Sequence, residues 1–318
     1  MSKRDVAEFL ALAAIWGASF LFMRVAAPAF GPMPLMLVRC AIGALTLLIV
    51  LVHQGKVRTL TARAGPLLAI GVINSAIPFV LLGYATLSLT AGVTSILNSL
   101  APLFSALIAF AWLGDRLTRA QMLGLALGVI GVVVLMGGGT DLASGGLPGG
   151  VTPDGSRVAT GLAERLFPFA VGILATLFYG LSANIARRHF MGVDPLATAT
   201  GSQIGATAAL LVPGVLLWPE ATAASPAPDT GIWVAALALG VVCTGVAYLL
   251  FFRLIASVGA TRTIAVTFVI PLFGVGWGAL FLGERIDAMT LAGGAIIMLG
   301  TALVTGVLRG RRAVAVKA

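Results

Sequence analysis

The segment TSILNSLAPLF at residues 94–104, which continues to LGDR at residues 113–116, occurs a second time in this chain. The second copy reads TIAVTFVIPLF at residues 263–273 and LGER at residues 282–285, 169 positions later and without a gap. The same register extends from residues 71–137 onto 240–306 and holds 16 identities in 67 positions, where composition alone would give roughly six. The chain therefore contains a true internal repeat, which is longer than the repeating unit of a soluble solenoid.

The composition indicates that most of the chain does not face water. Of its 318 residues, 59% are hydrophobic and only 10% are charged, with a mean hydropathy of +1.07, whereas a soluble domain carries about 25% charge. The net charge of +9 lies in short clusters between apolar runs, which is typical of the loops of a membrane protein. We therefore expect a lipid bilayer around the chain and no nucleic-acid partner.

Ten apolar runs are long enough to cross a bilayer, which takes about 20 residues in a helix. We predict an all-α integral membrane protein, with an uncleaved first helix at the N-terminus. The predicted spans are residues 6–26, 33–52, 66–87, 91–113, 119–137, 166–186, 195–218, 231–252, 259–282 and 288–308.

The orientation follows from the basic residues, because loops rich in Lys and Arg stay on the cytoplasmic side. With the N-terminus inside, 15 of the 20 Lys and Arg residues fall on the inner side. We therefore expect a bacterial-type inner (plasma) membrane protein with both termini in the cytoplasm. The predicted organisation is a five-helix repeat at residues 1–137, a Gly-rich outer linker at 138–165, and a second repeat at 166–318 that ends in a basic cytoplasmic tail. Because five is odd, the second repeat enters the membrane inverted relative to the first.

These residues resemble a known family. AIWGASF at residues 14–20, PLMLVR at residues 34–39 and the doubled PLF…LG(D/E)R segments are similar to the ten-helix EamA-type members of the drug/metabolite transporter superfamily. The resemblance covers nearly the whole chain, and the doubled segment is its most specific part. It implies transport, usually export, of small metabolites or drugs through a cavity between the halves. That cavity would be lined by spans 1, 3, 4, 6, 8 and 9, with spans 5 and 10 at the periphery.

The chain departs from the family pattern at two places. Asp115 stands where the family more often has Glu, which shortens the reach of any salt bridge there. The second half also lacks a Trp-Gly pair and an Arg at the places equivalent to Trp16 and Arg39; Tyr179 and Gly180 stand in for the former. We therefore expect an asymmetric substrate site.

Two prolines are candidate hinges. Pro102 and Pro271 fall within predicted spans, where each removes one backbone hydrogen bond and bends its helix. The carbonyls freed belong to Asn98 and Thr267, whose polar side chains are tolerated at membrane depth only beside protein or a water-filled cavity. They either supply polar groups to one central site or belong to plain structural kinks.

A second set of candidates lies on spans 3 and 8. Asn74 corresponds in the repeat to Cys243, the neighbouring Ser75 to Thr244, and Phe79 to Tyr248. Pockets commonly combine apolar walls with a few polar groups, so we expect an aromatic, weakly polar cavity. The alternative for any one aromatic is packing or an interfacial belt. The candidate substrate-binding residues are Trp16, Asn74, Phe79, Asn98, Tyr179, Thr244, Tyr248 and Thr267.

Arg39 lies about a turn and a half into the second span. An Arg in a span is a functional candidate by default; the alternatives are snorkelling to the interface and pairing with Glu284. The two cysteines and two histidines show no metal-ligand spacing, so we predict no metal, cofactor or catalytic residue.

The position of the eleven acidic residues favours one mechanism over another. All eleven fall in predicted loops or at span ends, whereas proton-coupled export of cations usually needs a carboxylate within the membrane. The sequence therefore predicts a secondary transporter, and an exporter in particular, of neutral or zwitterionic, amino-acid-like metabolites, working by alternating access at a midplane cavity. A proton-coupled multidrug or cation exporter and an intramembrane enzyme are the alternatives. The oligomeric state is left open, and the pattern is compatible with a monomer.

Overall fold

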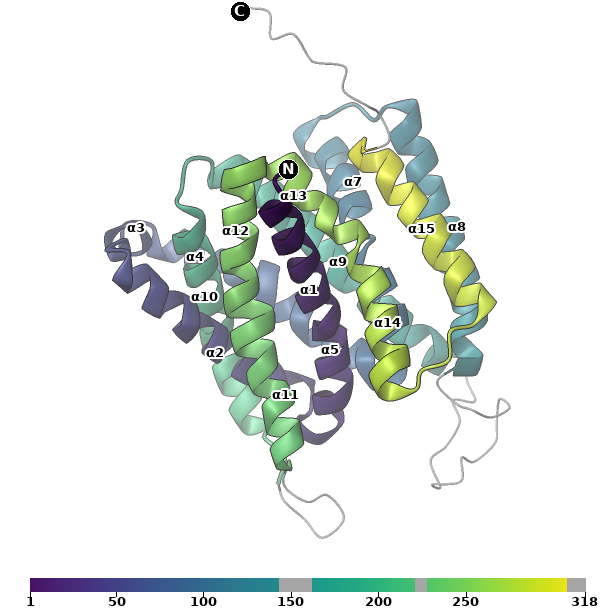
Figure 1. The fold of residues 1–318 in the computed structure, drawn as a ribbon, viewed down its shortest axis with the longest axis horizontal. Helices are drawn as coiled ribbons and strands as arrows, with labels where there is room; N and C mark the ends of the chain where they lie inside the picture. The colour runs from purple at the N-terminus through teal and green to yellow at the C-terminus, as the bar shows by residue number, and fades with distance from the viewer. Residues whose placement is uncertain (143–161, 221–227, 308–318) are drawn as a thin grey trace, which may run out of the picture.

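The computed structural model describes residues 1–142, 162–220 and 228–307, and every element in these ranges is a helix (Figure 1). The first half contains α1 (Lys3–Phe30), α2 (Pro32–His53), α3 (Val57–Thr61), α4 (Ala64–Gly71), η1 (Val72–Ala76), α5 (Ile77–Ser88), α6 (Ala91–Asn98), α7 (Ala101–Leu113) and α8 (Arg119–Leu142). The second half contains α9 (Leu162–His189), α10 (Pro195–Leu216), α11 (Thr230–Gly240), η2 (Val241–Val246), α12 (Ala247–Val258), α13 (Ala260–Ile264), η3 (Ala265–Phe268), α14 (Ile270–Leu282) and α15 (Ala288–Thr305).

Ten helical stretches in the described residues are long and apolar enough to cross a membrane, so the predicted number of spans is confirmed. Their ends differ from the prediction by a few residues. The first begins at Lys3 because Ser2 and Asp5 form a capping box, in which each side chain satisfies the other's backbone N–H. The linker predicted at 138–165 falls mainly on residues 143–161, and the basic tail on 308–318, which lie outside the described ranges.

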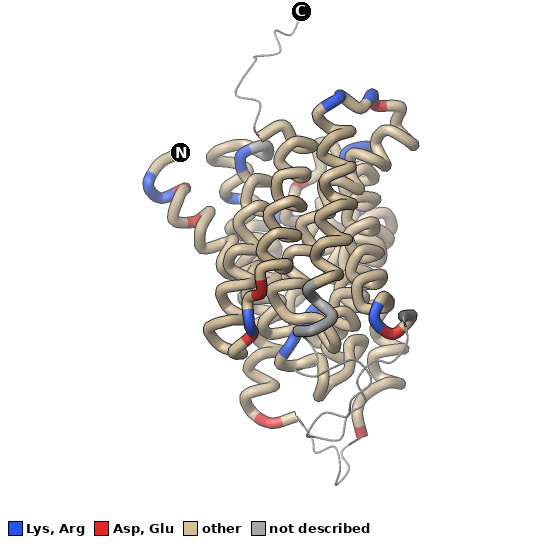
Figure 2. Tube along the Cα trace, turned by 90° about the vertical axis from the view of Figure 1, so that its right-hand side faces the viewer, with Lys and Arg blue, Asp and Glu red and all other residues tan. Residues whose placement is uncertain are grey.

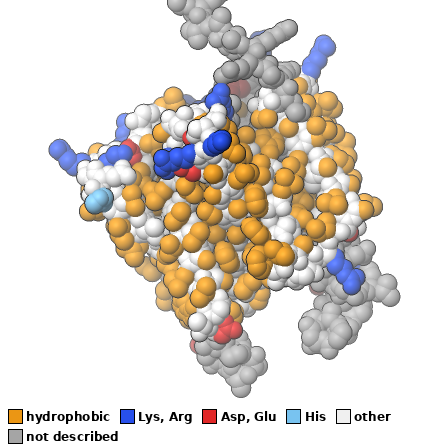
Figure 3. All heavy atoms as spheres, in the orientation of Figure 1, with side chains coloured by type: hydrophobic (Ala, Val, Ile, Leu, Met, Phe, Trp, Pro, Cys, Tyr) orange, Lys and Arg blue, Asp and Glu red, His pale blue; other side chains and the backbone are white. Residues whose placement is uncertain are grey.

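Charged residues gather toward the two ends of the bundle and leave a broad, almost uncharged band between them (Figure 2). Apolar side chains cover the middle of the face in Figure 3, with basic side chains along its upper edge. This distribution matches a bilayer-embedded surface. We call the end at which α1 begins and α9 ends the basic end, since it holds Lys56, Arg63, Arg187, Arg188 and Arg253.

The repeat is visible in the local geometry of the backbone. The π-helices η1 and η2 begin at Val72 and Val241, which are 169 positions apart, as in the sequence repeat. The helices α7 and α14 both end at a glycine in the left-handed conformation, Gly114 (φ 74°) and Gly283 (φ 63°). Glycine suits this position because it has no Cβ to clash there.

Pro102 and Pro271 interrupt their spans more fully than predicted. α6 ends at Asn98 and α7 begins at Ala101, with Pro102 in its first turn; Pro271 holds the same place in α14. A proline in the first turn of a helix costs no hydrogen bond, since that N–H has no partner within the helix. Each proline therefore starts a new helix where the sequence indicated a bend in a continuous one.

The helices of spans 5 and 10 pack on each other at one side of the bundle (Figure 1). The contact is symmetric: a Cβ on Gly124 would meet the backbone of Gly300, and a Cβ on Gly131 would meet that of Gly293. Gly124 and Gly131 correspond to Gly293 and Gly300 in the repeat. The pseudo-twofold axis therefore passes between α8 and α15.

Candidate functional site

Two π-helices place the candidate polar residues. η1 carries Asn74 and Ser75 within span 3, and η2 carries Thr244 within span 8. A π-helix turn widens the backbone and rotates the side chains that follow it, and such turns occur frequently at functional sites. Ser75 and Thr244, which the internal repeat aligns in the sequence, therefore also share a π-helical backbone.

The first polar group joins residues of both halves around Asn74. The Ser182 hydroxyl of α9 donates to Asn74 Oδ1 at 2.9 Å, and Asn74 Nδ2 lies 3.4 Å from Ser202 Oγ of α10. Ser75 Oγ lies 3.3 Å from Ser202 Oγ and accepts a hydrogen bond from Gln203 Nε2 at 2.9 Å. We call these five residues the amide–hydroxyl cluster. It contains hydrogen-bond donors and acceptors and no ionised group.

Gln203 leaves one acceptor of the amide–hydroxyl cluster unused. Its side chain is 0% exposed, and Oε1 has no hydrogen-bond partner in the described part of the chain. Because an unpartnered buried polar atom costs free energy, this oxygen is a candidate contact for a ligand donor.

Arg39 is a buried cation whose hydrogen-bond partner, Thr244, corresponds to Ser75 in the repeat. It is 5% exposed, and its Nε donates to Thr244 Oγ1 at 3.1 Å. The guanidinium carbon lies 3.8 Å from the centre of the Phe79 ring. Pairing with Glu284, one of the sequence alternatives, is wrong, because Glu284 instead accepts backbone N–H groups of Ala91 and Gly92.

Three of the predicted aromatic residues lie in different surroundings. Phe79 covers one face of the Arg39 guanidinium. Tyr179 packs against the buried hydrophobic cluster that contains Phe79. Tyr248 stacks on Phe252, with ring centres 5.8 Å apart.

The other three predicted binding residues lie elsewhere. Trp16 packs on Phe251, with ring centres 5.3 Å apart. The Thr267 hydroxyl of η3 donates to the carbonyl of Ile264 in the same span at 2.8 Å. Asn98 Oδ1 is buried without a partner in the described residues. The structure therefore brings Phe79 and Thr244 together at Arg39 and places Asn74 in the amide–hydroxyl cluster. It joins neither Asn98 nor Thr267 to them by a hydrogen bond within the described ranges.

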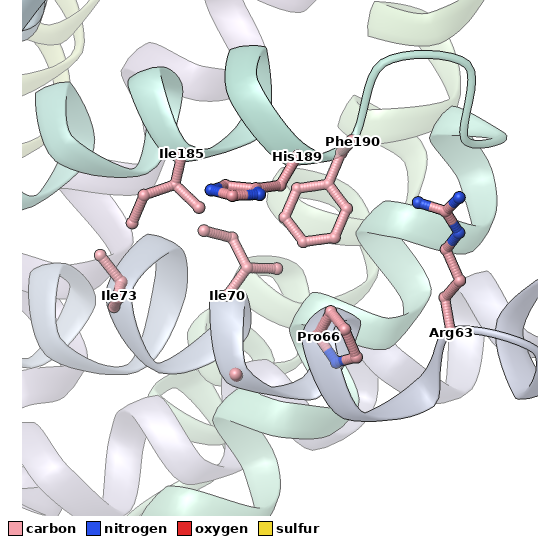
Figure 4. A pocket seen from close by; sticks show the side chains of 8 residues that line it. Arg63, Pro66, Ile70, Ile73, Ile185, His189 and Phe190 are labelled. Carbon is pink, nitrogen blue, oxygen red and sulfur yellow. The ribbon is translucent and has the colours of Figure 1, made fainter. Parts of the chain in front are cut away.

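A cavity of about 400 Å³ opens at the basic end, and the five residues of the amide–hydroxyl cluster do not line it. In Figure 4 its walls come from α4 and the start of η1 on one side and from the end of α9 on the other. Ile73 and Ile185 line it, and they lie one and three residues from the hydrogen-bonded Asn74 and Ser182. The lining residues are Arg63, Pro66, Ala69, Ile70, Ile73, Ile185, His189 and Phe190.

The sequence prediction missed three members of the cluster. Ser182 lies between Leu181 and Ala183, and Ser202 and Gln203 are adjacent residues of a largely apolar span. The position of Ser202 in its helix could have indicated a role in the site. The helices α2 and α10 each have 22 residues and begin at Pro32 and Pro195. Ser202 therefore takes the place in α10 that Arg39 takes in α2.

The fold and site define a multi-pass membrane protein whose two halves meet at a buried polar site, which is an architecture of secondary transporters. The EamA-like transporter family model matches residues 6–137 and 166–306. The chain belongs to this family, as the sequence resemblance predicted. A solved structure titled "Crystal structure of protein" shares the fold at a TM-score of 0.64, with 18% identity, and covers 97% of this chain and 99% of its own.

Several relatives carry names that describe export. The chain is 26% identical over 303 residues to a "Probable terminal-alkyne amino-acid exporter" of Streptantibioticus cattleyicolor, covering 93% of this chain and 92% of the relative. It is 26% identical to the "Pseudopaline exporter CntI" of Pseudomonas aeruginosa, covering 82% and 81%. It is 24% identical to a "Probable amino-acid metabolite efflux pump" of Salmonella typhimurium, covering 94% of each. Relatives that are named exporters thus span nearly the whole chain.

Proposed function

We propose that this protein is a secondary transporter that exports small neutral or zwitterionic, amino-acid-like metabolites. The observation that carries the proposal is the amide–hydroxyl cluster, because the Asn74–Ser182 hydrogen bond at 2.9 Å joins the two halves at a buried polar site. A site between two halves that move relative to each other is what alternating access requires. The amino-acid and metabolite exporters among its relatives support the same substrate class.

The proposal orients the basic end toward the cytoplasm of a bacterial-type inner membrane, with both termini inside. The cavity lined by His189 and Phe190 then faces the cytoplasm, where a substrate for export is loaded. The chain acts on small molecules within the bilayer without nucleic acid, a metal or a catalytic residue. One chain holds both halves of the site, so a monomer suffices.

The placement of the acids supports transport without a membrane-embedded proton carrier. In the described residues the carboxylates lie between helices, in the first two turns of a helix or, for Asp141, in the last turn of α8. Glu8, in the second turn of α1, is held by Arg4 at 3.0 Å and Arg253 at 2.8 Å. A proton-coupled cation exporter needs an acid within the membrane that exchanges its proton for substrate, whereas Glu8 lies near the basic end, at which its helix begins.

Counterflow into proteoliposomes tests the proposal. Purified protein is reconstituted and tested for exchange of radiolabelled L-leucine, L-phenylalanine and L-threonine, of nucleosides and of cationic drugs, each with and without an imposed pH gradient. Amino-acid exchange that ignores the gradient is expected. Gradient-driven movement of cations would favour the proton-coupled alternative, and no exchange of any class after confirmed reconstitution would contradict a transport function.

A further inference from the structure

Arg39 is a buried charge without an acidic partner. It is 5% exposed in the second span, and no carboxylate lies within 4.0 Å of it in the described part of the chain, where the ion pairs involve other residues. A buried ion normally pairs with an opposite charge, because removal from water is costly. An intramembrane Arg that lacks such a pair is available to bind an anionic group of a ligand.

The contacts of Arg39 fix its orientation. Nε donates to Thr244 Oγ1 at 3.1 Å, and Thr244 donates in turn to the carbonyl of Leu239 at 2.9 Å, so the hydroxyl can only accept from the guanidinium. Nη1 lies 3.7 Å from the sulfur of Met23, a weak acceptor, and Phe79 covers one face at 3.8 Å. Nη2 has no hydrogen bond to any described residue. A planar guanidinium with free N–H groups is suited to bind a carboxylate with two hydrogen bonds.

The internal repeat supplies a contrast on the other side of the site. In one contact, Arg39 of α2 donates to Thr244 of η2. In the equivalent contact, Ser202 takes the place of Arg39 and Ser75 takes the place of Thr244. The two contacts are equivalent, but one half presents a cation and the other presents neutral oxygens. Beside Ser202 lies the unpartnered Gln203 Oε1. The site therefore has a positive side and an accepting side.

We propose that the substrate carries a carboxylate that binds the Arg39 guanidinium and an ammonium group that donates to Gln203 Oε1 and its neighbours in the amide–hydroxyl cluster. A zwitterion satisfies both sides at once: its carboxylate neutralises the buried cation, and its ammonium fills the unused acceptor. A cationic drug fails on the first side because its charge repels the guanidinium. This inference rests on the proposed function and specifies the substrate class of the same site.

The test compares an amino acid with two analogues that each lack one group. The amino acid that exchanges fastest among L-leucine, L-phenylalanine and L-threonine competes in counterflow against its amide, which lacks the carboxylate, and against its 2-oxo acid, which lacks the ammonium. The variants are Arg39→Met, which removes the charge, and Arg39→Lys, which keeps the charge but loses the planar set of N–H groups that can bind a carboxylate with two hydrogen bonds. Arg285→Gln is the control, because Arg285 is exposed at the opposite end.

In the wild type we expect the amino acid to compete at least about tenfold better than either analogue. Arg39→Met should remove the preference for the amino acid over its amide, with Arg39→Lys intermediate and Arg285→Gln unchanged. Gln203→Leu should instead remove the preference for the amino acid over the 2-oxo acid. Size-exclusion profiles check folding; if Arg39→Met does not fold, Arg39→Lys decides alone.

The outcomes separate this inference from the proposed function. If the wild type exchanges amino acids and the Arg39 variants keep the preference for the acid over the amide, the assignment of Arg39 is overturned while transport stands. If the wild type exchanges none of the three amino acids, the proposed function fails, and the assignment of a zwitterion fails with it.

Discussion

Glu284 of the second half accepts a hydrogen bond from the backbone N–H of Ala91 in the first half at 2.8 Å, and its other oxygen accepts from Gly92 at 3.3 Å. The carboxylate thereby satisfies the free N–H groups at the N-terminus of α6, where a negative charge is favoured. Asp115, the equivalent residue of the first half, instead pairs with Arg187 at 2.8 Å. The contact of Glu284 with the N-terminus of α6 is thus not repeated by Asp115 at the basic end, where the cavity lies.

We expect Glu284→Ala to open the end opposite the basic end. The substitution removes a charged acceptor of two backbone N–H groups, worth about 1–3 kcal/mol, and so favours conformers in which α6 and α14 separate. Spin labels at Leu87→Cys and Ile286→Cys, both exposed, report the change by pulsed electron resonance as a growing long-distance component. The native cysteines are buried and should remain unlabelled.

Asp115→Asn is the matched control for Glu284. Asp115 and Arg187 are about half exposed, and exposed ion pairs contribute little to stability. The distance distribution of the spin labels should therefore stay that of the wild type. An unchanged distribution in Glu284→Ala would show that the capping contact does not hold this end closed.

A double-mutant cycle should detect the hydrogen bond between the halves. Asn74→Ala and Ser182→Ala each remove one partner of the 2.9 Å bond, and we expect a coupling of about 0.5–1.5 kcal/mol in the free energy of unfolding in mixed micelles. Ser257 and Asp5 form a pair at 2.7 Å that is exposed, so their cycle should show no measurable coupling. Additive effects of Asn74 and Ser182 would mean that the halves are not coupled through this bond.

The number of spans could be predicted from the sequence because bilayer thickness sets the length of each apolar run. The paired positions Ser75 and Thr244 were also accessible, since the repeat aligns them. Their shared π-helical backbone was not, because a π-turn is a local change in hydrogen bonding that no residue type requires.

The remaining site residues depend on how the halves pack. Arg39 has Thr244 and Phe79 as neighbours, which come from two other helices, and sequence spacing gives no information on such contacts between helices. Asn98 and Thr267, which are related by the repeat, were expected either to supply one central site or to belong to structural kinks, and Thr267 donates to Ile264 in its own span. Inverted symmetry relates positions in the fold; it does not fix the direction in which each side chain points.

The close contact of α8 and α15 should not tolerate side chains at its glycines. A Cβ on Gly300 would lie 2.6 Å from the carbonyl oxygen of Gly124 and 3.1 Å from the backbone N of Gly128, and backbone atoms cannot move aside as a flexible side chain can. We expect Gly300→Ala to lower the free energy of unfolding by about 1–3 kcal/mol. Thermal unfolding in detergent measures the change as a lower Tm.

Gly276→Ala is the matched control for Gly300. Gly276 lies within α14, and a Cβ there meets nothing within 4 Å. Alanine favours the helix over glycine, so the Tm should be equal or higher. A Tm for Gly300→Ala that equals that of Gly276→Ala would contradict the close packing.

Asp194 should make the stability of the α10 terminus depend on pH. Burial disfavours its charged form, but the Lys56 ammonium at 2.8 Å and the backbone N–H groups of Leu196 and Ala197 outweigh this and hold the pKa of Asp194 below its ordinary value. A lowered pKa in the folded state means that the charged residue stabilises the fold above about pH 4, the ordinary range of a free Asp. This contribution is lost as the pH falls through the folded pKa.

Comparison of Asp194→Asn with the wild type isolates the charge, because Asn caps a helix about as well as Asp. Lys56 is 42% exposed, so water screens the pair, and we expect a loss of less than about 1 kcal/mol at pH 7. The difference in Tm between wild type and variant should shrink toward zero as the pH is lowered from 5 to 3. Asp194→Ala also loses the cap, about 0.5–2 kcal/mol at pH 7, and part of its deficit should persist at pH 3, since the protonated Asp194 of the wild type keeps an oxygen that can accept from Leu196. A difference between wild type and Asp194→Asn that grows on acidification would mean that Lys56 and the two N–H groups do not stabilise the carboxylate.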